Sequence, residues 1–157
     1  FLLQMTGPRG VAPYYLPGET LTVYMRSDRE AWLNCFYIDS DGTFMRVLPN
    51  DFTAGGDASS RIGASELRIL PDPRLDPFEF RFTAETLGEE LLRCYATPAA
   101  PAPYLPPGLI APGFEPIRRD LATRIPAIFR MLPDMLVAHA QLTVTVGNDP
   151  QPLEEQQ

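Results

Sequence analysis

The sequence predicts a mainly β protein, an immunoglobulin-like β-sandwich of about seven strands with a small C-terminal helical element. Three observations lead to this prediction. Apolar and polar residues alternate in several short stretches between residues 18 and 97, which is the period of a half-buried strand. Turn-forming residues separate these stretches, and the intervals are too short for the helical crossovers of a parallel sheet. The 18 prolines limit helices and favour short strands joined by loops.

Length and composition indicate one domain. The chain has 157 residues, of which 45% are hydrophobic and 21% charged, as in ordinary folded domains. Because it begins at Phe1 rather than at a methionine, we expect it to be part of a longer protein. Five segments are expected: an extended N-terminal arm (1–17), the sandwich core (18–97), a proline-rich strap (98–113), a helix with a closing strand (114–147) and a tail (148–157).

Six strands are expected in the core. They span residues 19–26, 31–38, 43–48, 66–70, 78–82 and 89–97. The sequence Asp-Ser-Asp-Gly at residues 39–42 joins the second and third strands as a hairpin turn, in which Gly42 can adopt a positive φ. These two aspartates also suit a calcium ion, but the later acidic ligands of a calcium loop are missing. Phe78, Phe80 and Phe82 alternate with polar residues and should point into the core.

The C-terminal third carries the helical pattern. Apolar residues from Leu121 to Leu132 recur at spacings of three or four, which predicts a helix over 117–132. Pro126 must kink this helix or begin a second turn. Residues 141–146 alternate between leucine or valine and threonine or glutamine, and they predict the closing seventh strand. The strap at 98–113 is interpreted as a structural connector, with a ligand for a proline-recognising domain as the alternative.

Charge argues against several classes of protein. Thirteen basic residues against 20 acidic ones give a net charge of −7, whereas a nucleic-acid surface needs clustered positive charge. All the basic residues are arginines, so a lysine-based phosphate loop or Schiff base is excluded. No run approaches the roughly 20 apolar residues of a membrane helix. We expect no nucleic-acid partner, no membrane span in this segment and no cofactor.

Candidate catalytic and metal-binding residues are few. His139 is the only histidine, and no Gly-x-Ser-x-Gly sequence is present, so we interpret His139 as a structural or surface residue rather than a general base. Glu89 and Glu90 are adjacent on a strand and point to opposite faces, which excludes a glycosidase pair. The histidine and the two cysteines are widely spaced, unlike zinc ligands. We therefore expect no catalytic and no metal site.

The two cysteines, Cys35 and Cys94, are on the inward faces of their predicted strands. They form a disulfide if these strands face or neighbour each other, and otherwise remain two buried thiols. A bridge would favour the periplasm or cell envelope, and reduced thiols would leave a cytoplasmic location open. In immunoglobulin domains the tryptophan follows the first cysteine of the bridge, whereas here Trp32 comes before Cys35, which weakens the comparison.

The polar loop at residues 49–60 is the predicted contact surface for a protein partner. Asn50, Asp51 and Phe52 are its candidate contact residues, and Phe52 is its only large apolar side chain. The alternative is a loop that is merely flexible. The second predicted mode of contact is an open edge of the sandwich, to which a partner adds a strand.

Several of these stretches resemble the bacterial domain of unknown function DUF4384. The similarity rests on Gly-Glu-Thr-Leu at 18–21, the alternating strand and Asp-Gly turn at 31–42, Leu-Pro-Asn at 48–50 and the strand at 90–97. It covers residues 15–97, and the helix-then-strand ending resembles longer members. The resemblance implies an accessory domain without known catalytic residues, found attached to serine/threonine kinases, caspase-like peptidases and envelope lipoproteins.

The sequence therefore leads to the hypothesis of a non-catalytic binding or assembly module of a larger bacterial protein, mediating protein–protein interaction in the cell envelope. The alternative is a regulatory or sensor domain that acts on an attached kinase or peptidase. A small-molecule sensor would instead need a closed apolar cavity with a few polar groups.

Overall fold

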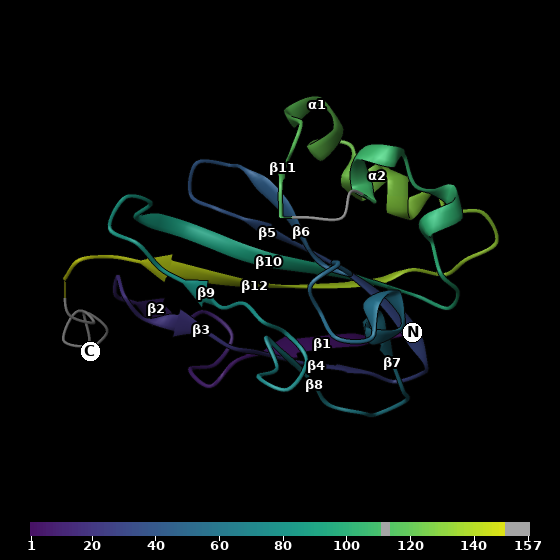
Figure 1. Cartoon of the computed structure of the whole chain (residues 1–157), viewed down its shortest axis with the longest axis horizontal. Helices are drawn as coiled ribbons and strands as arrows, with labels where there is room; N and C mark the ends of the chain where they lie inside the picture. Colours follow the sequence, from purple (N-terminus) through teal and green to yellow (C-terminus); the bar gives the residue numbers. More distant parts are fainter. Residues whose placement is uncertain (111–113, 150–157) are drawn as a thin grey trace.

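A computed structural model describes residues 1–110 and 114–149, apart from the side chains of residues 56 and 57. Most of the predicted tail at 148–157, and the last residues of the strap, lie outside the described residues. The fold is mainly β, and three layers follow one another in Figure 1: small sheets, one large sheet and a layer of short helices.

The large sheet is the middle layer. Its strands are ordered β11-β6-β5-β10-β12-β2, and all neighbours are antiparallel except β12 and β2. The strands are β2 (Tyr14–Tyr15), β5 (Ala31–Ile38), β6 (Phe44–Leu48), β10 (Gly88–Thr97), β11 (Pro116–Ile117) and β12 (Ala138–Val146), with β7 (Arg61–Ile62) paired to β5. The long strands β5, β10 and β12 form its centre.

Two small sheets cover the inner face of the large one and complete a sandwich-like arrangement. One has the order β1-β4-β8, and the other pairs β3 with β9. The strands are β1 (Leu3–Thr6), β3 (Thr20–Leu21), β4 (Val23–Ser27), β8 (Arg68–Leu70) and β9 (Phe80–Arg81). In Figure 1 they run beneath β10 and β12.

The helical layer lies on the opposite face of the large sheet and comes from the chain between β10 and β12 (Figure 1). It contains α1 (Arg119–Ala122), α2 (Ile125–Arg130) and the 3-10 helices η2 (Ala102–Tyr104) and η3 (Pro107–Leu109). A further 3-10 helix, η1 (Gly56–Ser60), lies in the loop before β7.

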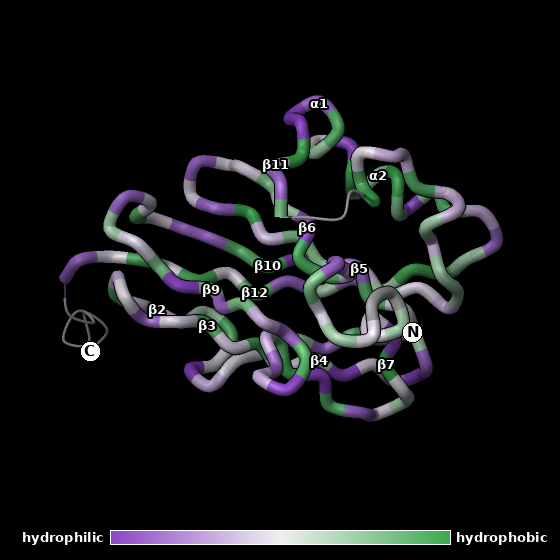
Figure 2. The backbone as a smooth tube through the Cα atoms, in the orientation of Figure 1, coloured by the Kyte–Doolittle hydropathy of each residue, from purple (hydrophilic) through white to green (hydrophobic). Residues whose placement is uncertain are grey.

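Two apolar cores hold the layers together. The larger core fills the space between the sheets, and its most buried side chains include Leu33, Leu92 and Leu142. The second core packs Phe36 and Tyr95, on the outer face of the large sheet, against Leu121, Ile125 and Phe129 of the helical layer. In Figure 2 the tube through α2 is mainly green, whereas hydrophobic and hydrophilic segments alternate along the central strands β10 and β12. The helical layer thus covers the part of the outer face that carries Phe36 and Tyr95.

The expected helix over 117–132 is two short helices. Pro126 lies in the first turn of α2, where backbone N–H groups have no partner within the helix, so the missing N–H of proline costs nothing. The first helix, α1, ends before Pro126. Within the described residues, no helix has the length and apolar character needed to cross a membrane.

Two other segments differ in detail from the sequence expectation. The stretch 19–26 is divided at Thr22, because β3 pairs with β9 whereas β4 pairs with β1 and β8. The arm at 1–17 contributes β1 and β2 to two different sheets.

Candidate functional site

The loop at residues 49–60 is organised around Asn50, which is buried. Its side-chain amide donates hydrogen bonds to the Val47 carbonyl and to Thr53 Oγ1, each at 2.8 Å, and its Oδ1 accepts from the backbone N–H groups of Phe52 and Thr53. The amide of Asn50 is therefore occupied within the loop. Asp51 and Phe52 are exposed, so these two predicted contact residues remain accessible.

A buried ion pair fastens this loop to β8. Thr53 Oγ1 donates to Asp76 Oδ1 at 2.7 Å, and the guanidinium of Arg68 binds both Asp76 oxygens at 2.9 and 3.1 Å. The side chains of Arg68 and Asp76 are 8% and 0% exposed, and the Asp72 N–H adds a further bond to Asp76. A buried carboxylate needs this number of donors, so the network serves the fold.

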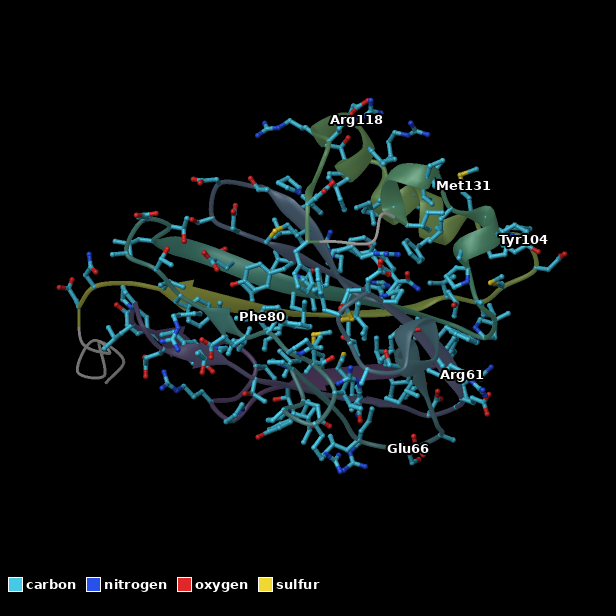
Figure 3. The ribbon with its side chains drawn as sticks, viewed as in Figure 1. Arg61, Glu66, Phe80, Tyr104, Arg118 and Met131 are labelled. Carbon is cyan, nitrogen blue, oxygen red and sulfur yellow. A yellow bond between two sulfur atoms is a disulfide. The ribbon has the colours of Figure 1, made fainter. Side chains whose placement is uncertain are left out.

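A row of aromatic rings leads from the loop toward the sandwich interior. Phe52 packs on Phe114 with ring centroids 5.3 Å apart, Phe114 on Phe78 at 4.9 Å, Phe78 on Phe80 at 5.7 Å, and Phe80 stacks on Tyr37 at 5.2 Å. Phe52 is 54% exposed at the outer end of the row. Figure 3 shows Phe80 lying between the layers. The loop therefore presents one large apolar side chain supported by others beneath it.

Tyr37 forms the inner end of the aromatic row and hydrogen-bonds Glu90, which is buried. Burial and this carboxylate both raise the pKa of the Tyr37 hydroxyl above its usual range. Glu89, the neighbour of Glu90, is exposed on the other face of β10, so the two carboxylates do not converge.

The turn at residues 39–42 uses its first carboxylate for backbone contacts. Asp39 Oδ1 accepts hydrogen bonds from the N–H groups of Asp41 and Thr43 at 2.9 and 3.0 Å. Gly42 has φ of 83°, a conformation that glycine adopts without strain. Across the described residues, no group of three or more histidine, cysteine, aspartate or glutamate side chains is arranged to hold a metal ion.

Cys35 and Cys94 form a disulfide between neighbouring strands of the large sheet. They lie directly opposite each other on β5 and β10, with Cα atoms 4.1 Å apart, and both are fully buried. The bridge thus joins two strands of one sheet, unlike the immunoglobulin bridge, which joins two sheets.

A groove lies between the helical layer and the outer face of the large sheet. Its floor is Arg93 and Tyr95 of β10 beside Gln141 and His139 of β12, which pair across the two strands. Phe129 and Arg130 of α2 form one wall, and the groove encloses about 540 Å³. The other wall is the apolar run Met135, Leu136 and Val137 that leads into β12.

The floor of the groove is held in place by contacts among its own residues. The ring of Tyr95 stacks on Phe129 with centroids 4.3 Å apart and 7° between the planes. Arg93 donates from Nε and Nη2 to Gln141 Oε1 at 3.2 and 3.1 Å. Burial raises the pKa of the Tyr95 hydroxyl, and the positive charges of Arg93 and Arg130 partly oppose this shift. The guanidinium groups of Arg93 and Arg130 are therefore both close enough to the Tyr95 hydroxyl to influence its pKa.

His139 is exposed at the edge of this groove, with its ring centroid 6.3 Å from that of Tyr95. The groove residues offer guanidinium donors, an amide and apolar side chains, which suit binding of an anion with an apolar neighbour. The residue pattern of the sequence did not predict this arrangement. The available signal was that Arg93 and Tyr95 share one face of a strand, but their partners Phe129 and Arg130 are distant in sequence.

The chain matches the model of a known protein family. A family model described as "Domain of unknown function (DUF4384)" matches residues 14–100. No curated protein and no solved structure gave a significant match. The matched range contains β2 to β10, with the predicted contact loop and both cysteines, whereas the helical layer and β12 follow it.

Proposed function

The chain belongs to the DUF4384 family, a domain of unknown function, and on that premise we propose that it is a non-catalytic protein-binding module of a larger protein. Its binding surface is the helical layer together with the adjoining groove. The single observation that carries this proposal is the set of large apolar side chains that the layer leaves exposed.

Four such side chains extend from the helical layer. Tyr104 is 54% exposed, Ile110 41%, Met131 78% and Leu136 68%. Figure 3 shows Tyr104 and Met131 on the outer side of the layer, away from the sheets. These side chains come from four segments of the same layer, and exposed apolar side chains on one side of a protein are typical of surfaces that another macromolecule covers. We therefore place the partner against this layer.

The most direct test is photo-crosslinking from a reactive amino acid placed at position 131, carried out with the full-length protein. We expect one dominant crosslinked protein partner, whose yield falls when Leu136 is replaced by Asp. Leu67→Asp is the matched control, since Leu67 is 46% exposed and lies beside β8 on the opposite layer. Equal loss with both variants, or no discrete crosslink, contradicts the proposal.

The loop at 49–60 supplies a second candidate surface for the same function. Phe52 is exposed and supported by Phe114, as expected of an apolar anchor rather than of a flexible loop. Replacing Phe52 by Ala should then reduce capture of the partner, while Asp51→Ala, a neighbouring exposed change, should have little effect. Retention of full capture by Phe52→Ala eliminates the loop as the contact surface.

For location, we propose the periplasm or cell envelope of a bacterium, because the bridge between Cys35 and Cys94 is stable in an oxidising compartment. The partner is a separate protein in the first version of the proposal and an attached kinase or peptidase in the second. Crosslinks within one chain, as opposed to crosslinks between two chains, distinguish these versions.

A further inference from the structure

We propose that the groove between α2 and the outer face of β10 and β12 binds an acidic, apolar peptide segment of the partner, with the peptide carboxylate held by Arg93 and Arg130. This inference rests on the proposed function and adds the chemistry that the partner must offer. Three features of the groove lead to it: its charge, its apolar wall and the rigidity of its floor.

The charge of the groove is opposite to that of the chain. The net charge is −7, yet Arg93, Arg130 and His139 line the groove, and none of the lining residues that the structure describes is acidic. Seven other arginines form ion pairs with carboxylates. Among the described residues, Arg93 and Arg130 have no such ion pair, as is also true of Arg26, Arg119 and Arg124, but only Arg93 and Arg130 line one groove. A carboxylate from outside is the natural complement of two guanidinium groups without an acidic partner.

The apolar wall indicates a peptide rather than a small anion. Met135, Leu136 and Val137 follow one another along the groove, and Phe129 faces it from α2. Leu136 is also one of the exposed apolar residues of the helical layer, so the wall continues onto the surface that we assign to the partner. A peptide can bury apolar side chains on this wall on either side of its carboxylate.

The floor is already arranged for binding. Tyr95 is stacked on Phe129, and Arg93 is fixed by two hydrogen bonds to Gln141, so these side chains lose little conformational freedom when a ligand arrives. These bonds engage Nε and Nη2 of Arg93.

The test uses the whole chain and two synthetic peptides, acetyl-Gly-Leu-Glu-Leu-Gly-amide and the same peptide with glutamine in place of glutamate. The chain has five methionines, of which Met135 lines the groove and Met25 is fully buried in the sandwich core. Methionine methyl NMR signals therefore report binding at the groove and at a distant control position. We expect a saturable shift of the Met135 signal with the glutamate peptide and none at Met25.

Arg130→Gln should lower the affinity for the glutamate peptide about tenfold, because a charge-assisted hydrogen bond to the peptide carboxylate is lost. Arg119→Gln removes the same charge from an exposed helical position outside the groove and should leave the affinity unchanged. Both side chains are exposed, so both variants should retain the methyl spectrum of the folded protein.

Besides an Arg130→Gln variant with unchanged affinity for the glutamate peptide, three outcomes overturn the inference. These are no shift at Met135, equal binding of the glutamine peptide, and binding of benzoate as tight as that of the glutamate peptide, which would make the groove a small-molecule site. If crosslinking to the partner responds to Leu136→Asp while Arg130→Gln has no effect on the peptide, the protein-binding function stands and only the carboxylate inference fails.

Discussion

The aromatic ring of Tyr95 lies parallel to that of Phe129, with centroids 4.3 Å apart, and this contact joins the large sheet to α2. Phe36 packs against both rings at nearly right angles, with centroids 6.2 and 6.0 Å away. Phe129 is 0% exposed and contacts both rings of the sheet, so it links the sheet to the helical layer within the second core.

Replacing Phe129 by Ala should therefore lower the free energy of unfolding by about 3–5 kcal/mol, because the substitution removes a buried ring and leaves a cavity. Met131→Ala, two residues away and 78% exposed, should change it by less than about 0.5 kcal/mol. Urea unfolding of both variants measures the difference. A loss below about 1 kcal/mol for Phe129→Ala would show that the helical layer does not contribute to the cooperative unit.

The ion pair between Arg68 and Asp76 gives a second prediction. Asp76→Ala leaves a buried guanidinium and Thr53 without their acceptor, and it should cost about 3–5 kcal/mol. Asp120→Ala removes a carboxylate from the exposed pair with Arg118 and should cost less than about 1 kcal/mol. Chemical denaturation distinguishes the two. Similar costs for both variants would contradict the structural role of the Asp76 network.

Asn50 and Asp51 test whether the loop has one structure. Asn50→Ala removes four hydrogen bonds from a buried position and should destabilise the protein by about 1–3 kcal/mol. Asp51→Ala, at an exposed position, should be within about 0.5 kcal/mol of the unmodified protein. Thermal unfolding monitored by circular dichroism compares them, and a neutral Asn50→Ala would contradict the hydrogen-bonded loop.

The surface pair of Arg9 and Glu19 predicts a pH dependence. Hydrogen bonds from the Arg9 guanidinium, followed by one from the Leu16 N–H, lower the pKa of Glu19 from 4.5 to about 2. Because the folded pKa is below the unfolded one, this stabilisation is complete above pH 4.5 and is lost as the pH falls toward 2.

Arg9→Gln should thus reduce the free energy of unfolding by about 0.5–1 kcal/mol at pH 7, a value limited by solvent screening of two partly exposed side chains. Near pH 2 the Glu19 carboxylate becomes protonated, so the part of the difference in unfolding free energy that comes from this pair should largely disappear. Unfolding curves at several pH values measure the difference. If the difference in unfolding free energy does not depend on pH, the effect comes from packing of Arg9 over the Tyr15 ring and not from the ion pair.

The disulfide between Cys35 and Cys94 encloses a long loop, with a sequence separation of 59. Replacing both cysteines by Ala should lower the free energy of unfolding by about 2–4 kcal/mol, since the unfolded chain gains freedom. Mass spectrometry after alkylation under non-reducing conditions should find no free thiol in the unmodified protein. Two alkylated cysteines would contradict the bridge and with it the argument for an oxidising compartment.

The parts of the fold that depend on local pattern were predictable. The strand at Ala31–Ile38 follows from alternation within it, and the turn ending at Gly42 follows from its residue types. The division of 19–26 between two sheets was not predictable, since the partners of β3 and β4 are distant in sequence. The same holds for β2, whose two residues pair in parallel with Thr145 and Val146.

The candidate site was predictable only in part. The sequence identified Phe52 as an apolar residue on a polar loop, and the structure leaves it exposed. It also placed Asn50 among the contact residues, although the hydrogen-bonding capacity of its amide is used to close the loop. The groove required knowledge of which helix covers which half of the sheet, and no local spacing brings Arg93 together with Arg130.

The helical layer is inserted between two strands that are already neighbours, because Ala96 of β10 pairs with Ala138 of β12. The segment between them leaves the sheet after β10 and returns to it beside β10, touching it in between only where β11 pairs with β6 at the edge, so its length can change without altering the register between β10 and β12. Two constraints apply to a replacement: it must still cover the rings of Phe36 and Tyr95, and it must still pair with the edge strand β6 as β11 does. The sandwich can therefore be conserved while the inserted layer diverges, and a new recognition surface can evolve, or be grafted, on an unchanged scaffold.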